Sequence, residues 1–221
     1  MINLNLNITQ NQISDFMKDV ISENFNIEKE NIIGIFRYDL ANYDESFEEI
    51  IPKDRFLTIL KTDKEMDEET EEDMLKIRAV SEHDFQKLLD SNDPVATECF
   101  FQKNPLYLKT KSFTFNHDSK KAKEKFKEKF LEYVSISKYY LTEEKNKKLA
   151  ALYLFKAERT FFLLSQLLEK GKITDFTSIN PTYIDIELLL TKKSYEWPEI
   201  QKLIKEYAQN IKKVFMENEK C

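Results

Sequence analysis

The spacing of apolar residues in the first third of the chain predicts one helix followed by short strands. Apolar residues recur every three or four positions between 13 and 25, which is typical of a helix with one face packed against a neighbour. Short apolar runs at 31–38, 55–61 and 75–80 are rich in β-branched residues and predict three strands. The pattern therefore indicates a small sheet with a helix against it.

Helix-capping and helix-breaking residues divide the segment 81–115 into elements. Ser81-Glu-His-Asp84 has the pattern of a capping box and predicts a helix that buries Phe85, Leu88 and Leu89. Asn92-Asp-Pro94 ends that helix, and the apolar run 95–101 fits either a helix or a strand. Residues 106–115 predict extended chain.

From residue 119 onward the pattern is helical throughout. Lys120 to Phe130 is rich in lysine with an aromatic stripe, and apolar residues nearly encircle the segment Thr142 to Lys170, which predicts the central helix of a bundle. Gly171 stands where a left-handed glycine ends a helix. Asn180-Pro181 and Trp197-Pro198 each predict the start of a further helix.

These elements predict an α+β fold, with a small mixed sheet and flanking helices followed by a C-terminal helical bundle. The distribution of charge supports a division near residue 119, where the helical pattern begins. Residues 1–118 hold 13 Lys and Arg against 25 Asp and Glu, a net charge of −12, whereas residues 119–221 carry +6. We therefore expect two domains, 1–118 and 119–221.

Composition excludes several classes of chemistry. Only two of the 221 residues are glycine, so the chain cannot form the glycine-rich loops of P-loop and Rossmann phosphate sites. Two cysteines and two histidines exclude a disulfide framework and leave too few ligands for a Cys/His metal site. No apolar run approaches a membrane span, and the N-terminus lacks the features of a signal peptide, so the expected location is the cytoplasm.

Residues 63–73 hold eight carboxylates and one lysine. Because charges of one sign repel one another at this density, the stretch predicts a solvated loop between strands. The alternative is an acidic surface that engages a basic partner.

Three motifs occur in an order that resembles a known family. Lys156, Arg159 and Gly171 occupy the places of a His-x-x-Arg pattern followed by a glycine twelve residues later. The stretch Leu190 to Tyr195 is similar to Ile-Lys-x-Gly-x-Tyr, and Phe85 to Phe101 is similar to a third segment around Asn-Pro, with Asp93-Pro94 and Glu98 in register. With these motifs the chain resembles the predicted nucleotidyltransferases of the DNA polymerase beta superfamily, which include RNA-repair-associated proteins of bacteria and phages. The resemblance implies a nucleotidyltransferase-like sheet domain at 1–118.

The catalytic signature of that family is degenerate here. Family members carry Gly-Ser after the first strand, Ser-Asp-x-Asp at the second and a third carboxylate on a neighbouring strand. These carboxylates hold two metal ions that bridge the triphosphate and the attacking hydroxyl. In this chain Asp54 matches one carboxylate as a relic, Phe56 stands where the second belongs, and 75–80 contains no acid.

A lone carboxylate cannot hold two magnesium ions against their hydration. We therefore predict a catalytically inactive nucleotidyltransferase-like protein without a cofactor, which acts by binding a protein partner or nucleic acid. A viral accessory or anti-defence factor is one setting for such a protein. The alternative is an active magnesium-dependent enzyme with a rearranged acidic site built from Asp39, Asp44, Glu48, Glu49 and Asp54.

Any anionic ligand is expected on the positively charged half, because the first half repels phosphate. The predicted ligand-binding residues are Lys156, Arg159, Lys172, Lys192 and Lys193. Lys156 and Arg159 lie one turn apart, so an interdomain salt bridge is the alternative role for this pair. His83-Asp84 and His117-Asp118 are weak candidates for acid–base pairs, because sequence neighbours rarely face each other.

Overall fold

The computed structural model describes residues 10–38, 54–72, 75–109 and 112–175, together with the isolated positions 198, 202, 205, 206, 208, 209 and 213. The chain divides into two compact units. Unit 1 comprises Met1–Tyr38, Lys53–Asp90 and Val95–Asn116, and unit 2 comprises Asp39–Pro52, Ser91–Pro94 and His117–Cys221. The two domains expected at 1–118 and 119–221 stay a prediction.

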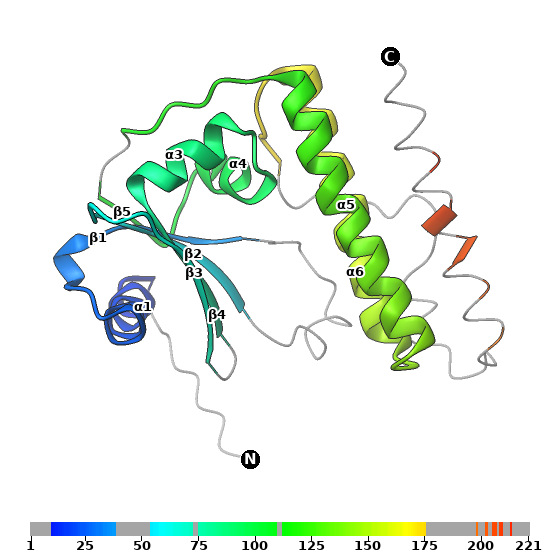
Figure 1. The fold of residues 1–221 in the computed structure, drawn as a ribbon, viewed down its shortest axis with the longest axis horizontal. Helices are drawn as coiled ribbons and strands as arrows, with labels where there is room; N and C mark the ends of the chain where they lie inside the picture. Colours follow the sequence, from blue (N-terminus) through cyan, green and yellow to red (C-terminus); the bar gives the residue numbers. More distant parts are fainter. Residues whose placement is uncertain are drawn as a thin grey trace. The chain divides into compact units, whose positions relative to one another are not determined.

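A five-stranded mixed sheet is the framework of unit 1 (Figure 1). The strands are β1 (Ile32–Arg37), β2 (Asp54–Leu60), β3 (Asp67–Glu72), β4 (Leu75–Ser81) and β5 (Tyr107–Leu108). Their order across the sheet is β3-β4-β2-β1-β5. β2 and β4 run parallel, whereas β1 pairs antiparallel with β2 and β5, and β3 pairs antiparallel with β4. The three strands predicted from apolar runs are confirmed.

Helix α1 (Gln10–Phe25) covers one face of the sheet (Figure 1). Met17 and Ile21 of α1 are buried in an apolar cluster with residues from three strands: Ile32, Ile35, Phe56, Leu60, Ile77 and Ala79. Ile32 and Ile35 share this face although three positions separate them, because the β1–β2 register shifts between Ile32 and Gly34. The predicted helix is confirmed, but its apolar stripe is only partly covered, since Phe16 remains 58% exposed.

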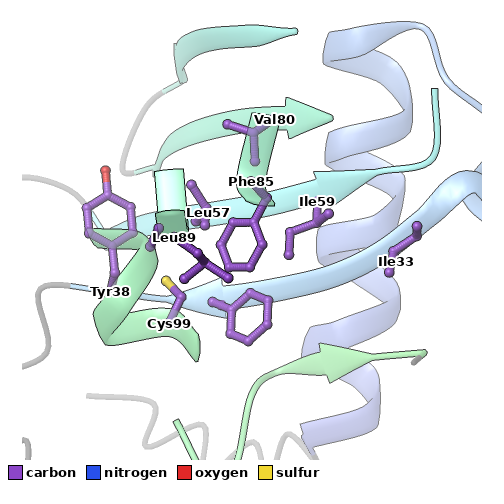
Figure 2. Close-up of a cluster of buried hydrophobic side chains, with 10 residues drawn as sticks. Ile33, Tyr38, Leu57, Ile59, Val80, Phe85, Leu89 and Cys99 are labelled. Atoms are coloured by element: carbon purple, nitrogen blue, oxygen red, sulfur yellow. The ribbon is translucent and has the colours of Figure 1, made fainter. Parts of the chain in front are cut away.

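Helices α3 (Glu82–Asp90) and α4 (Pro94–Phe101) cover the opposite face (Figure 1). Phe85 and Leu89 of α3 and Cys99 of α4 lie against the apolar side chains of β1, β2 and β4 (Figure 2). The apolar run 95–101, which fits a helix or a strand by pattern, is thus a helix. Cys99 is completely buried and serves as a core residue.

A long helical hairpin forms the described part of unit 2 (Figure 1). Helices α5 (Ser119–Thr142) and α6 (Lys147–Lys170) pack along each other. Asp118 caps α5 by accepting backbone N–H bonds from Lys120 and Lys121, and Asn146 caps α6 by accepting from Leu149. The sequence placed the start of the long helix at Thr142, which is wrong by about one turn, because α5 extends through that residue and Asn146 begins the next helix.

Helix α6 is buried almost all round, as its encircling apolar residues predicted. It ends at Gly171, whose φ of 66° is left-handed as expected. After this turn the chain folds back along α6. The side chain of Gln166 fixes it by accepting N–H bonds from Thr174 and Asp175 and donating to the carbonyl of Asp175. The helices predicted from Asn180 and Trp197 lie outside the described residues, apart from isolated helical positions.

Candidate functional site

One end of the sheet collects the positions at which the resemblance expects catalytic carboxylates. β1 ends at Arg37 where β2 begins, since Arg37 is the antiparallel partner of Phe56. β4 begins beside β2, since Asp54 is the parallel partner of Leu75. Asp54 is therefore the first residue of a central strand, as the sequence predicted for the surviving carboxylate.

Phe56, which stands where the resemblance expects the second carboxylate, is a core residue. Its side chain is 5% exposed and belongs to the apolar cluster beneath α1. Its cross-strand partner Ile77 is completely buried in the same cluster. An acid at either position would be desolvated among apolar side chains, which disfavours the charged form that binds metal.

The neighbouring strand β4 presents cations at this end of the sheet. Lys76 is the direct partner of Arg55 on β2, and Arg78 is the partner of Leu57. Ammonium and guanidinium groups cannot ligate a metal ion. Within the part of the chain that the structure describes, no group of three or more His, Cys, Asp or Glu side chains is placed to hold a metal ion.

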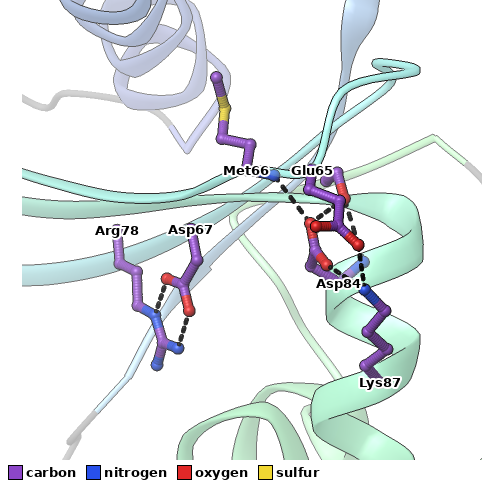
Figure 3. Close-up of polar contacts among 7 residues, drawn as sticks. Glu65, Met66, Asp67, Arg78, Asp84 and Lys87 are labelled. Atoms are coloured by element: carbon purple, nitrogen blue, oxygen red, sulfur yellow. Dashed lines mark hydrogen bonds and ion pairs between the residues drawn. The ribbon is translucent and has the colours of Figure 1, made fainter.

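The acidic stretch is a strand, so the prediction of a solvated loop at 63–73 is wrong for most of it. Residues 67–72 form the edge strand β3 along β4. The cations of β4 make this possible: Lys76 pairs with Glu69 at 2.6 Å and with Glu71 at 3.5 Å, and Arg78 forms a two-pronged ion pair with Asp67 (Figure 3). Cross-strand pairs of opposite charge offset the repulsion that the sequence alone suggests.

A polar junction fixes the segment that enters this edge strand. The carboxylate of Asp84 accepts hydrogen bonds from the Ser81 hydroxyl at 2.6 Å and from the Met66 backbone N–H at 2.8 Å (Figure 3). Lys87 bridges Asp84 and Glu65. The bond from Ser81, followed by that from Met66, lowers the pKa of Asp84 from 3.8 to about 2. In return the Ser81 hydroxyl accepts the backbone N–H of Asp84, so Ser81 caps the helix as predicted. The second bond of a full capping box is absent, because the Ser81 backbone N–H donates to the Met66 carbonyl.

The cations predicted to bind ligands fall into different environments. Lys156 and Arg159 of α6 are buried, with 5% and 3% of their surfaces exposed, and Glu158 between them is buried as well. The Lys156 ammonium lies 5.5 Å from the centre of the Tyr153 ring and 5.9 Å from that of Tyr133, which is cation–π geometry. This pair is therefore part of the interior of unit 2 rather than a face presented to solvent.

The three other predicted cations are not brought together with that pair by the described structure. Lys172 is exposed just after Gly171. Lys192 and Lys193 lie outside the described residues, as do Asp39, Asp44, Glu48 and Glu49 of the alternative acidic site. A ligand-binding role for these residues stays a prediction.

In both His-Asp neighbours the aspartate has a structural role. Asp84 belongs to the junction with Ser81, and Asp118 caps α5, where the Lys121 N–H lowers the pKa of its carboxyl. His117 instead lies 3.0 Å from the Ser119 hydroxyl on the exposed surface. Sequence reasoning missed that the acidic stretch and the basic positions of β4 are partners. The signal was present, because acids occupy every second position at 67, 69 and 71, and the cations at 76 and 78 have the same spacing.

Among the comparisons with known proteins, the comparison with solved structures gives a match. No family model matches the chain, and no curated protein does. Among solved structures the chain is similar to a nucleotidyltransferase-like protein from Exiguobacterium sibiricum 255-15. The TM-score is 0.36 and the identity 13%, over 93% of this chain and 75% of that chain. None of the described helices is long and apolar enough to cross a membrane.

Proposed function

We propose that this protein is a nucleotidyltransferase-like protein that does not transfer nucleotides and acts by binding a partner. The observation that carries this proposal is the burial of Phe56 at the position of the second metal-binding carboxylate. On the neighbouring strand Lys76 and Arg78 flank Ile77 and pair with the acids of β3, and neither supplies an oxygen ligand in place of the missing acid. The two-metal chemistry that the resemblance implies thus lacks its second carboxylate on β2 and its third on β4.

Binding is the remaining use for such a framework. The sheet is packed against helices on both faces, which supports its use as a stable framework for a binding surface. Charge is spread unequally along the chain, since the first 118 residues hold −12 and the rest +6. Opposite charge on one chain selects charged partners of defined sign, and it speeds their association.

Nucleotidyl transfer is the decisive test of this proposal. The full-length protein is incubated with each labelled nucleoside triphosphate, with magnesium or manganese, and with RNA and protein acceptors. We expect no incorporation above a protein-free control. Incorporation that Asp54→Ala abolishes would refute the proposal and establish the alternative enzyme built on the acids at 39–54. Asp90→Ala, which changes an exposed acid far along α3, is the matched control.

A pull-down from the native host tests the binding half of the proposal. Tagged full-length protein is recovered, and bound protein and nucleic acid are identified by mass spectrometry and sequencing. We expect one or a few specific partners that survive moderate salt. Recovery of nothing beyond a tag-only control at both low and moderate salt would contradict a binding function.

A further inference from the structure

The outer edge of β3 is an open strand edge. β3 is the terminal strand of the sheet, and no strand among the described residues pairs with its outer side. It runs for six residues, Asp67–Glu72, in unbroken register with β4, with no bulge or proline to interrupt it. Such an edge offers a row of backbone donors and acceptors to another strand.

The hydrogen-bonding pattern shows which backbone groups face outward. The Ser81 N–H donates to the Met66 carbonyl at 3.0 Å, so this pair is of the hydrogen-bonded type. In an antiparallel ladder the types alternate, so Glu68 and Thr70 also direct their backbone groups toward β4. Asp67, Glu69 and Glu71 therefore direct their N–H and C=O groups to the open side.

Charge decides which strand fits this edge. Five of the six residues of β3 are acidic, whereas β4 pairs two cations, Lys76 and Arg78, with them. A second copy of β3 would bring like charges opposite one another, which opposes self-pairing. A strand with lysine or arginine at alternate positions would instead place its cations beside Asp67, Glu69 and Glu71.

We propose that the outer edge of β3 binds an extended basic segment of a protein partner, which adds to the sheet as a sixth strand. Backbone hydrogen bonds to Asp67, Glu69 and Glu71 hold the segment, and alternating cations select it. This inference rests on the proposed binding function and names the chemistry of the partner. The junction at Asp84 supports it, because the carboxylate holds the Met66 N–H and so fixes the start of β3 before any partner arrives.

A matched pair of variants separates backbone pairing from charge. Glu69→Pro and Glu69→Thr both remove the carboxylate that pairs with Lys76. Only proline also removes the outward N–H, and it leaves the β4 ladder intact because that N–H does not face β4. Slow amide exchange at Glu68 and Thr70, whose N–H groups face β4, verifies that each variant keeps the strand.

The probe is a peptide of about seven residues that alternates lysine and threonine, with capped ends. A second peptide of the same charge carries a proline at its centre. Binding to full-length protein is measured by fluorescence anisotropy at low and moderate salt, and residue-resolved exchange is measured by NMR. We expect the first peptide to slow exchange at Asp67, Glu69 and Glu71, and to bind Glu69→Pro at least about tenfold more weakly than Glu69→Thr.

Several results would overturn the inference. Equal binding of the two peptides, or of the two variants, would reduce the contact to nonspecific charge attraction. The inference would also be refuted if no peptide bound at low salt, or if self-association protected the Glu69 N–H. Binding of single-stranded RNA that Glu69→Pro abolishes would refute it as well. If Glu69→Pro still captured a host partner, the outer edge of β3 would not be the binding site, and the proposed binding function would stand. Nucleotide incorporation by the wild type would refute that function and leave the peptide result unchanged.

Discussion

Replacing the carboxylate of Asp84 should remove a pH-dependent part of the stability of unit 1. In Asp84→Asn the side chain keeps its shape but loses the charge that accepts bonds from Ser81, Met66 and Lys87. The wild-type pKa of Asp84 falls from 3.8 to about 2 on folding, and each pKa unit corresponds to about 1.4 kcal/mol. Because solvent reaches 15% of this side chain and screens it, we expect a loss of about 1–2 kcal/mol at neutral pH.

The sign of the pH dependence follows from the lowered pKa. The folded protein favours the charged carboxylate, so the contribution is complete above the ordinary pKa near 4 and disappears as pH falls through about 2. Urea unfolding of wild type and Asp84→Asn between about pH 7 and pH 2 measures the difference in the free energy of unfolding. We expect the difference to shrink toward zero at the acid end.

Glu82→Gln is the control for this experiment. It removes one charge from the same first turn of α3 without touching Ser81 or Met66, so its effect should stay below about 0.5 kcal/mol. NMR exchange of the Met66 N–H reports the local effect, which should be faster in Asp84→Asn. A difference between wild type and Asp84→Asn that stays constant across the acid range would refute the assigned role of the carboxylate.

Three further predictions concern the packing of the two units, and each is checked by chemical unfolding at neutral pH. Phe56→Ala should lower the free energy of unfolding by about 3–5 kcal/mol, because a fully packed ring leaves a cavity, whereas Phe56→Leu should cost less than half as much; equal effects would contradict the packing described. Gln166→Ala should cost about 2 kcal/mol through the unsatisfied backbone groups of Thr174 and Asp175, and hydrogen exchange there should rise; unchanged exchange would contradict the tether. Gly171→Ala should cost about 1 kcal/mol because of the positive φ, and Gly171→Asn should cost less; a stabilising alanine would refute a left-handed cap.

The sequence determined most elements of unit 1 because their signals are local. Apolar runs at 31–38, 55–61 and 75–80 became β1, β2 and β4, because short runs of β-branched and apolar residues suit a buried, pleated surface. The Ser81 cap and the Gly171 turn were also readable, because a cap depends on residues within one helical turn.

Only the tertiary structure decided the fate of the charged residues. Self-repulsion predicts a loop at 63–73, but β4 supplies Lys76 and Arg78 in register, and the acids become an edge strand. Likewise, Lys156 and Arg159 of α6 are buried in the interior of unit 2, although the sequence predicted that they bind a ligand. The free energy of a charge depends on which partners and how much water lie within a few ångströms, and chain folding alone brings those partners together.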